Sequence, residues 1–429
     1  MEITELQDIY ASHPGVEALS QLTGEKHKEA VKLCGLTASS AAIVVSGYMK
    51  RHERQTLFIV MNDAEEAGYF YHDLVQICGE KRVLFFPSSY RRALRYGQED
   101  EANRILRTEV MSRLSSKSRK YGTVIVTHTE AVAEKVVSQA KMEDNTLHLA
   151  LGDTISRDEI EKRLAKLGFK ETQYVYEPGE YATRGSLLDI YSYSSEYPYR
   201  IDFFGNEVES IRTFELETQL SKERMEEISI VPRLTDTESV PITTFLPRGT
   251  IYVAKDFRFI QESIGKIKAE GYSRQAQLSE EELPDLPDLM SAAEIERHIQ
   301  SAPRWEIHAQ QASPESAGIA IKFDTSPQPL FHKEFDLVSD KFKEYGRNNY
   351  RIILLTDDAR QAQRLRTIFD ERGDEITFTA ANRTIHAGYI DNTLRLALIT
   401  DHQLFGRFHN YRLRKIGRAS CRERVFMMV

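Results

Sequence analysis

Cysteine is scarce in this 429-residue sequence, which has only Cys34, Cys78 and Cys421. They are too few and too widely spaced for a disulfide framework or for a zinc site built on cysteine ligands. No apolar run approaches the roughly 18 residues that a membrane span needs. The start, MEITELQDIYASHPG, carries early charges and lacks the apolar core of a signal peptide. These absences predict a soluble, cytoplasmic protein that does not contact a membrane.

A positive overall charge is also missing. The 57 Lys and Arg residues are outnumbered by 65 Asp and Glu, which gives a net charge of −8. No global field therefore draws the protein to nucleic acid, and any such contact must be local. The 12 histidines are scattered, without the H-E-x-x-H spacing of a zinc site, so we expect no metal.

The phosphate-binding pattern G-x-x-x-x-G-K-[ST] is absent as well. In CGLTASSAAIVVSGYMK, Gly35 fits the first glycine, but Ser40, Ala41 and Ala42 stand where Gly, Lys and Ser/Thr belong. The segment IGKIK has no hydroxyl residue after its lysine. Without a lysine for the β- and γ-phosphates and a hydroxyl for Mg²⁺, we expect a degenerate site with no nucleotide, no cofactor and no ATPase activity.

The first third of the chain is typical of a parallel α/β domain. Continuous apolar strands are predicted at 55–63, 82–89 and 122–130, with helical patterns between them. From about 146 the sequence pattern changes. It predicts one helix that begins after Ser156, followed by strands and tight turns. The α/β pattern resumes near 233, and a further β-α-β unit begins near 330. We therefore predict a multidomain α/β protein with domain segments 1–145, 146–232, 233–325 and 326–415.

Two basic segments raise the alternative of a sequence-independent DNA-binding protein. Arg91, Arg92 and Arg95 lie among tyrosines in SSYRRALRY, which is a composition found in strand-binding patches. The tail at 416–429 is also basic, but it does not resemble the rest of the sequence. We interpret the tail as non-native sequence and the arginines as part of a solvated loop.

A predicted hairpin places an aromatic residue on a charged face. In YRIDFFGNEVES the pair Gly205-Asn206 is a two-residue turn signal. Period-2 alternation then puts Phe203 on the apolar side and Phe204 on the opposite side, with Arg200, Asp202, Glu207 and Glu209. Arginine and aromatic residues are enriched at binding hot spots. In the simpler alternative, Phe204 packs under a loop and Arg200 pairs with Asp202.

A second candidate is Arg184 in EPGEYATRGSLLDI, next to Gly185 in a predicted turn or bulge. Glu180 and Asp189 flank it and could be drawn as an acid–base pair. We interpret both carboxylates instead as turn and strand-edge residues, with Arg184 as a possible ion-pair partner.

The stretch GDTISRDEIEKRLAKLGF…YEPGEYATRGSLLDIYS…YPYRIDFFGNEVESIRTFELETQLS, at roughly 146–222, closely resembles the module shared by UvrB and the bacterial transcription-repair coupling factors (Mfd). Three features favour the Mfd family. The phosphate loop is degenerate, no aromatic hairpin follows FFPSSYRR, and GYIDNTLRLALITDHQLFG resembles the end of the third Mfd domain.

This resemblance implies a UvrB-like domain 1 that binds no nucleotide, with an inserted β-rich domain that recruits UvrA. The family's UvrA contacts fall on Arg184, Arg200 and Phe204. In full-length members, RNA polymerase and double-stranded DNA are further partners, and the C-terminal region masks the UvrA surface. The sequence stops before the polymerase-binding and motor regions, so we expect a monomeric recruitment module that is not an enzyme. The alternative from another class is a nucleotide-driven DNA-repair enzyme of the UvrB/helicase type.

Overall fold

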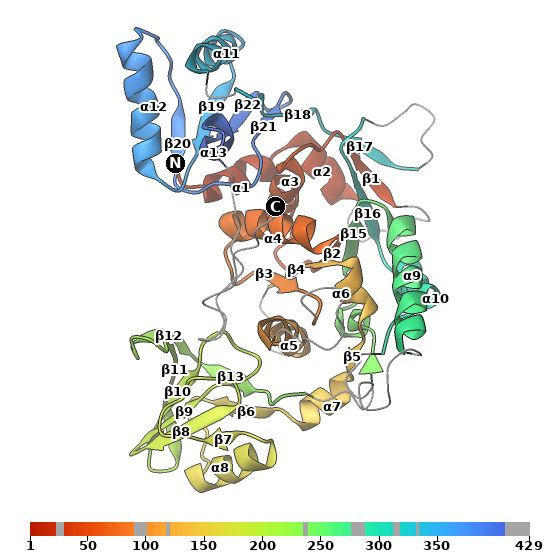
Figure 1. The fold of residues 1–429 in the computed structure, drawn as a ribbon, viewed down its shortest axis with the longest axis vertical. Helices are drawn as coiled ribbons and strands as arrows, with labels where there is room; N and C mark the ends of the chain where they lie inside the picture. The colour runs from red at the N-terminus through yellow and green to blue at the C-terminus, as the bar shows by residue number, and fades with distance from the viewer. Residues whose placement is uncertain are drawn as a thin grey trace.

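The computed structural model describes residues 1–22, 30–89, 101–116, 121–234, 239–275, 288–311, 318–331 and 334–407. These residues form an α/β unit in the middle, a β-rich unit at one end and a smaller α/β unit at the other (Figure 1). The predicted mixed α/β architecture with a parallel sheet and a β-rich region is confirmed. Arg91, Arg92, Arg95 and the tail at 416–429 lie outside the described residues.

The central unit is built on a seven-stranded parallel sheet with the order β17-β1-β16-β15-β2-β4-β3. Its strands are β1 (Val31–Cys34), β2 (Leu57–Met61), β3 (Val83–Phe86), β4 (Val124–His128), β15 (Ile251–Ala254), β16 (Arg304–His308) and β17 (Ala320–Lys322). The three strands predicted from apolar runs are β2, β3 and β4, and every residue in them is buried. The chain leaves this sheet after β4 and returns at β15, so the β-rich unit is an insertion.

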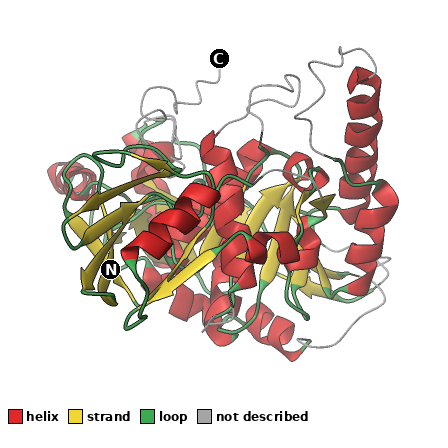
Figure 2. Cartoon of the chain, turned by 90° about the horizontal axis from the view of Figure 1, so that it is seen from below, coloured by secondary structure: helices red, strands yellow, loops and turns green. Residues whose placement is uncertain are grey.

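Helices cover both faces of the central sheet (Figure 2). Their bounds are α1 (Thr4–Ala11), α2 (Pro14–Gln21), α3 (Ser40–Arg51), α4 (Ala64–Cys78), α5 (Glu101–Ser115), α6 (Thr129–Ala133), α7 (Gln139–Asp144), α9 (Phe257–Gln275) and α10 (Ala292–Ser301). Alternate residues of β2 enter different cores: Leu57 and Ile59 pack with α1–α4, whereas Phe58 and Val60 pack with α6, α9 and α10. The short strands β5 (Val136–Val137) and β14 (Ser239–Val240) pair beside this unit, and a 3-10 turn, η1, spans Ile242–Phe245.

The β-rich unit has a six-stranded sheet with the order β12-β11-β10-β9-β8-β7, antiparallel except for the β7–β8 pair. Its strands are β7 (Lys170–Glu171), β8 (Glu180–Arg184), β9 (Leu187–Ile190), β10 (Tyr199–Phe204), β11 (Glu207–Phe214) and β12 (Ser221–Met225). Helix α8 (Arg157–Lys166) and the pair β6 (Leu147–Ala150) and β13 (Glu227–Ile230) pack on one face of this sheet. The Ser156 hydroxyl accepts the Glu159 N–H and caps α8, as predicted.

The smaller α/β unit has a five-stranded mixed sheet with the order β18-β21-β22-β19-β20. Its elements are β18 (Thr325–Pro327), α11 (Phe335–Arg347), β19 (Arg351–Leu355), α12 (Ala359–Glu371), β20 (Thr379–Ala381), β21 (Tyr389–Asp391), β22 (Leu396–Thr400) and α13 (Asp401–Leu404). The β-α-β unit predicted beyond residue 330 corresponds to β19, α12 and β22, and α11 precedes it. None of the helices within the described residues is long and apolar enough to cross a membrane.

A buried polar network joins the smaller unit to the central one. Tyr10 of α1 donates its hydroxyl to Asp391 Oδ2 at 2.7 Å and accepts the Tyr389 hydroxyl at 2.9 Å. On the same interface, the Asp73 carboxylate of α4 is 3% exposed and accepts the His386 N–H at 2.6 Å. Burial raises the pKa of Asp73 to about 7, against the opposing effect of hydrogen bonds from Ser39 and the His386 N–H. The two units therefore share one continuous core.

The raised pKa makes the contribution of Asp73 to stability depend on pH. The native state retains a proton that the unfolded state releases near its ordinary pKa of 3.8, so this contribution is full below pH 4 and is lost as the pH rises through about 7. Asp73→Asn has no proton to lose. We expect its free energy of unfolding to exceed that of the parent at pH 8 by on the order of 2–4 kcal/mol, and the difference to close near pH 4.

Urea denaturation at both pH values measures this effect, with Asp8→Asn as the exposed control. Equal stabilities of parent and Asp73→Asn at pH 8 would contradict the assignment.

Candidate functional site

One face of the six-stranded sheet is apolar and buried, and the other is polar. Successive residues of a strand point to opposite faces, so Ile201 and Phe203 of β10 enter the core, while Arg200, Asp202 and Phe204 lie on the polar face. The register of β9 against β10 places Asp189 directly opposite Arg200. The sheet therefore brings together side chains that are far apart in sequence.

The Asp189 carboxylate is the centre of this polar face. It is 1% exposed and forms a bidentate pair with Arg200, with Nε to Oδ1 at 2.7 Å and Nη2 to Oδ2 at 2.9 Å. Arg184 donates to the same carboxylate through its Nη2. Two guanidinium groups thus share one buried carboxylate, and the cluster keeps a net positive charge.

Arg200 is held on several sides. Its Nη1 and Nη2 donate to the Gln219 carbonyl at 3.2 Å and to Gln219 Oε1 at 3.0 Å, and its Cζ lies 4.2 Å from the centre of the Phe214 ring. The hydrogen bonds to Asp189 raise the pKa of Arg200 above its ordinary value, although burial opposes them. Arg200 therefore has little freedom and few donors left for a partner.

Arg184 is more accessible. Its side chain is 33% exposed, and its Cζ lies 4.8 Å from the centre of the half-exposed Tyr174 ring. Its Nε is buried without a hydrogen-bond partner. The adjacent turn contains Gly185 at φ +63°, which a side chain rarely adopts, and Arg157 of α8 donates to the Gly185 carbonyl. The turn and Asp189 together hold Arg184 in place, although a third of its side chain stays exposed.

Phe204 stands at the end of the β10–β11 hairpin. Gly205-Asn206 forms the predicted turn, with Phe203 opposite Val208 and Phe204 opposite Glu207. Phe204 is 77% exposed, so the alternative in which it packs under a neighbouring loop is wrong. A register shift between Asp202 and Phe203 leaves a bulge in β11, which the sequence alternation did not predict.

The alternative pairing of Arg200 with Asp202 is also wrong. Asp202 accepts the Ser186 hydroxyl at 2.7 Å and lies 3.9 Å from Arg212, while Arg200 pairs with Asp189. Glu180 accepts the N–H groups of Tyr176 and Glu177, so it is a turn residue as interpreted from the sequence. Because both oxygens of Asp189 are occupied by arginine donors, Asp189 and Glu180 do not form an acid–base pair.

The candidate phosphate loop follows β1 and precedes α3. Gly35 has φ +82°, and a Cβ at this position would lie 2.1 Å from the Phe323 carbonyl oxygen. Thr325 donates its hydroxyl to the Gly35 carbonyl at 2.7 Å, and Ser39 accepts the Ala387 N–H at 2.9 Å. Two segments of the smaller unit, β18 and the loop before β21, therefore contact this loop directly.

The first helical residues after that loop are enclosed as well. Ser40, Ala41 and Ala42 are 0%, 7% and 1% exposed, and none of them carries a charge. The Ser40 hydroxyl donates to the Thr37 carbonyl at 2.6 Å. The one hydroxyl among these three positions is thus used within the loop.

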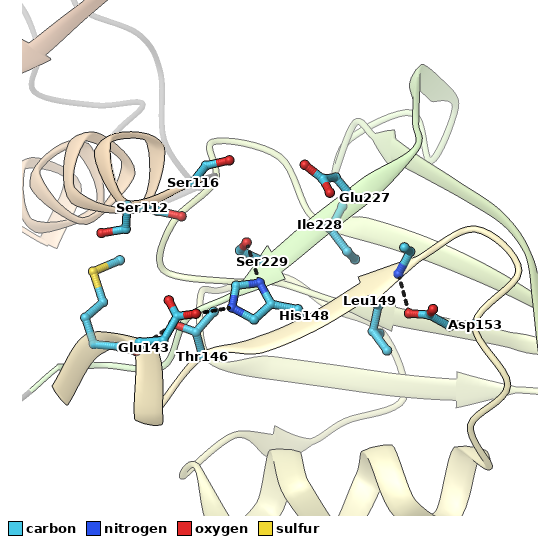
Figure 3. Close-up of a pocket in the computed structure, with 13 residues that line it drawn as sticks. Ser112, Ser116, Glu143, Thr146, His148, Leu149, Asp153, Glu227, Ile228 and Ser229 are labelled. Carbon is cyan, nitrogen blue, oxygen red and sulfur yellow. Dashed lines mark hydrogen bonds and ion pairs between the residues drawn. The ribbon is translucent and has the colours of Figure 1, made fainter. Parts of the chain in front are cut away.

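A polar cavity of about 290 Å³ lies between the central and β-rich units (Figure 3). Ser112 and Ser116 of the α5 end face Glu143, His148 and Ser229 across it. His148 Nδ1 lies 3.1 Å from the Ser229 hydroxyl, and its Nε2 lies 3.7 Å from Glu143. The histidine and the glutamate are both more than half exposed, and no cluster of three His, Cys, Asp or Glu residues with metal-binding geometry occurs in the described part of the chain.

Sequence reasoning missed several residues of the polar face. Tyr174 and Gln219 come from the loops that flank the sheet and carry no pattern of their own. Arg212 and Arg224 occupy β11 and β12 on the same face as Arg200. Period-2 alternation could have placed each of them within its own strand, but only the strand order brings them beside Arg200.

Parts of the chain are similar to known proteins. Residues 147–235 match the family described as the UvrB interaction domain. The transcription-repair-coupling factor of Bacillus subtilis (strain 168) is 20% identical over 454 residues, which cover 87% of this chain and 38% of that protein. The factor of Escherichia coli (strain K12) is 26% identical over 234 residues, covering 54% of this chain and 20% of that protein.

The transcription-repair-coupling factor of Myxococcus xanthus is 32% identical over 108 residues, which are 25% of this chain and 9% of that protein. The chain thus spans at most about two fifths of the length of these three relatives. The β-rich unit, with Asp189 and its two arginines, lies within the segment that matches the UvrB interaction domain.

Removing the shared carboxylate should destabilise this domain. Asp189→Ala leaves two neighbouring guanidinium groups without their counter-charge, and breaking a buried ion pair from one side costs about 3–5 kcal/mol. Because Arg184 is partly exposed, we expect a loss of about 3 kcal/mol in the free energy of unfolding.

Urea denaturation followed by circular dichroism measures this loss. Asp202→Ala is the control, since Asp202 is 27% exposed and its ion pair is long, and it should cost less than about 1 kcal/mol. Equal losses in the two variants would show that Asp189 is not central to the domain.

Proposed function

We propose that this chain is a recruitment module of a transcription-repair coupling factor and that it binds UvrA through the polar face of its UvrB interaction domain. The observation that carries this proposal is Phe204, a large aromatic side chain that is 77% exposed on the face that also carries two arginines held by a buried carboxylate. Exposed aromatic residues beside arginines are typical of protein-binding hot spots.

The energetics of the face suit a protein partner. Burying a phenylalanine side chain contributes about 1.5–3 kcal/mol. Arg184 and Arg200 are already fixed by Asp189, so little side-chain entropy remains to be lost on binding. The match to the UvrB interaction domain and the similarity to transcription-repair-coupling factors support UvrA as this partner.

Phe204→Ala should weaken UvrA binding by about 30-fold or more, because hot-spot truncations cost at least about 2 kcal/mol. The measurement is the dissociation constant of the full chain for purified UvrA, by biolayer interferometry. Since Phe204 is largely exposed, the thermal unfolding midpoint of the Phe204→Ala variant should stay at the parent value.

Leu330→Ala is the matched control, because Leu330 is 70% exposed but belongs to the linker before α11. It should bind UvrA like the parent. Parent-like affinity of Phe204→Ala would refute the assignment of this face.

We further propose that the central unit is a degenerate P-loop domain and that this chain does not hydrolyse ATP. Ser40, Ala41 and Ala42 supply no cation for phosphate, and Thr325 and Ala387 already bond to the loop. A triphosphate would have to displace both contacts and would gain no lysine in return.

Equilibrium binding of labelled ATP to the purified chain should therefore show no saturation up to millimolar nucleotide. Supplying the lysine and the hydroxyl in the double variant Ala41→Lys, Ala42→Thr should not create binding, because Thr325 and Ala387 still bond to the loop. A micromolar dissociation constant for the parent chain would overturn the proposal and favour a nucleotide-driven enzyme.

A further inference from the structure

Three arginines stand side by side across the β-rich sheet. The register pairs Arg200 of β10 with Arg212 of β11, and Arg212 with Arg224 of β12. Directly opposed residues share a face of the sheet, and Arg200 lies on the face that carries Arg184 and Phe204. The neighbours Ile211 and Met225 point the other way, into or against the core. These three residues, which we call the arginine row, therefore extend the polar face toward the edge strand β12.

The carboxylates on this face do not neutralise the row. Asp189 is fully occupied by Arg200 and Arg184. Arg212 has one distant carboxylate, Asp202 at 3.9 Å, and its Nε is buried without a partner. Arg224 is exposed and forms no ion pair among the described residues. Like charges directly opposite each other on neighbouring strands are destabilising, so Arg212 and Arg224 raise the energy of the isolated domain.

We propose that Arg212 and Arg224 form the outer part of the UvrA site and bind carboxylates of an acidic surface on that partner, an inference that rests on the function proposed above. Guanidinium groups in a fixed row present paired donors that match carboxylate geometry. The inner part of the site, at Phe204 and Arg184, supplies apolar contact and one further cation.

An acidic protein surface fits this face better than nucleic acid. Phe204 lies next to Glu207 on the hairpin, and Asp202 shares the face between them and the arginine row. These carboxylates would repel a phosphate backbone passing along the face. A folded partner can instead place its own carboxylates only against Arg212 and Arg224.

If Arg212 and Arg224 bind UvrA, removing them should weaken binding without lowering stability. If they are only solvated surface residues, removing them should leave binding unchanged. Replacing Arg212 and Arg224 by alanine removes like-charge repulsion, so the free energy of unfolding should stay at or above the parent value. The same double variant should bind UvrA about tenfold more weakly, with a shallower dependence of affinity on salt. Arg212→Lys keeps the charge but loses the paired donors, so its UvrA affinity should lie between those of the parent and the double variant.

The test measures the dissociation constant for UvrA from 50 to 300 mM NaCl and urea stability for parent, Arg212→Ala/Arg224→Ala, Arg212→Lys and Arg163→Ala. Arg163 is a matched exposed arginine on α8, on the other face of the sheet, and its variant should bind like the parent. Phe204→Ala reports on the proposed function in the same assay.

Unchanged UvrA affinity in the double variant, with binding lost in Phe204→Ala, would overturn this inference and leave the proposed function intact. Failure of the parent chain to bind UvrA would overturn both. A marked loss of stability in the double variant would also refute the inference, as would parent binding to a DNA duplex that the double variant abolishes.

Discussion

The buried carboxylate of Asp189 is the interaction on which the polar face of the β-rich unit depends. A carboxylate that is 1% exposed must be paired, because an isolated ion at that depth would lose its hydration without compensation. Two arginines from neighbouring strands supply the pairing. The Phe214 ring of β11 and Gln219 of the loop that follows it also contact Arg200. The result is a rigid cationic surface at whose border the Phe204 side chain is left uncovered. The stability of the domain and the arrangement of its polar face thus depend on the same carboxylate.

The loop between β1 and α3 of the central unit lies at the contact with the smaller unit. The parallel sheet of the central unit, with this glycine-containing loop between β1 and α3, has the layout in which many α/β proteins hold a ligand at the strand ends. Here the loop is bonded instead to Thr325 and Ala387, and its neighbours Tyr10 and Asp73 form polar contacts with the smaller unit. The loop is thus part of the junction between the central and smaller units. This junction makes the central and smaller units one body from which the β-rich unit projects (Figure 1).

Local patterns predicted local features well. The apolar runs of β2, β3 and β4, the Ser156 cap and the Gly205-Asn206 turn each depend on a few adjacent residues, and all were found. The alternative that pairs Arg200 with Asp202 is wrong because strand order decides the partner. Asp202 is nearer in sequence, but β9 lies beside β10 and presents Asp189. The bulge in β11 and the arginine row depend on the same long-range register. The alternation within one strand fixes the face of a residue, whereas its neighbours on that face belong to the tertiary fold.

The four arginines of this face differ in how many of their donors are already used inside the domain. Arg200 uses most of its donors on Asp189 and Gln219, so its removal would disturb the domain even if no partner touched it. Arg184 is partly exposed, Arg212 has only a long ion pair with Asp202, and Arg224 has none among the described residues. Recognition energy is available only from groups whose bonding improves when a partner arrives. In the proposed site, Asp189 and Arg200 therefore support the face, whereas Phe204, Arg184 and the two further arginines are the groups left to contact a partner.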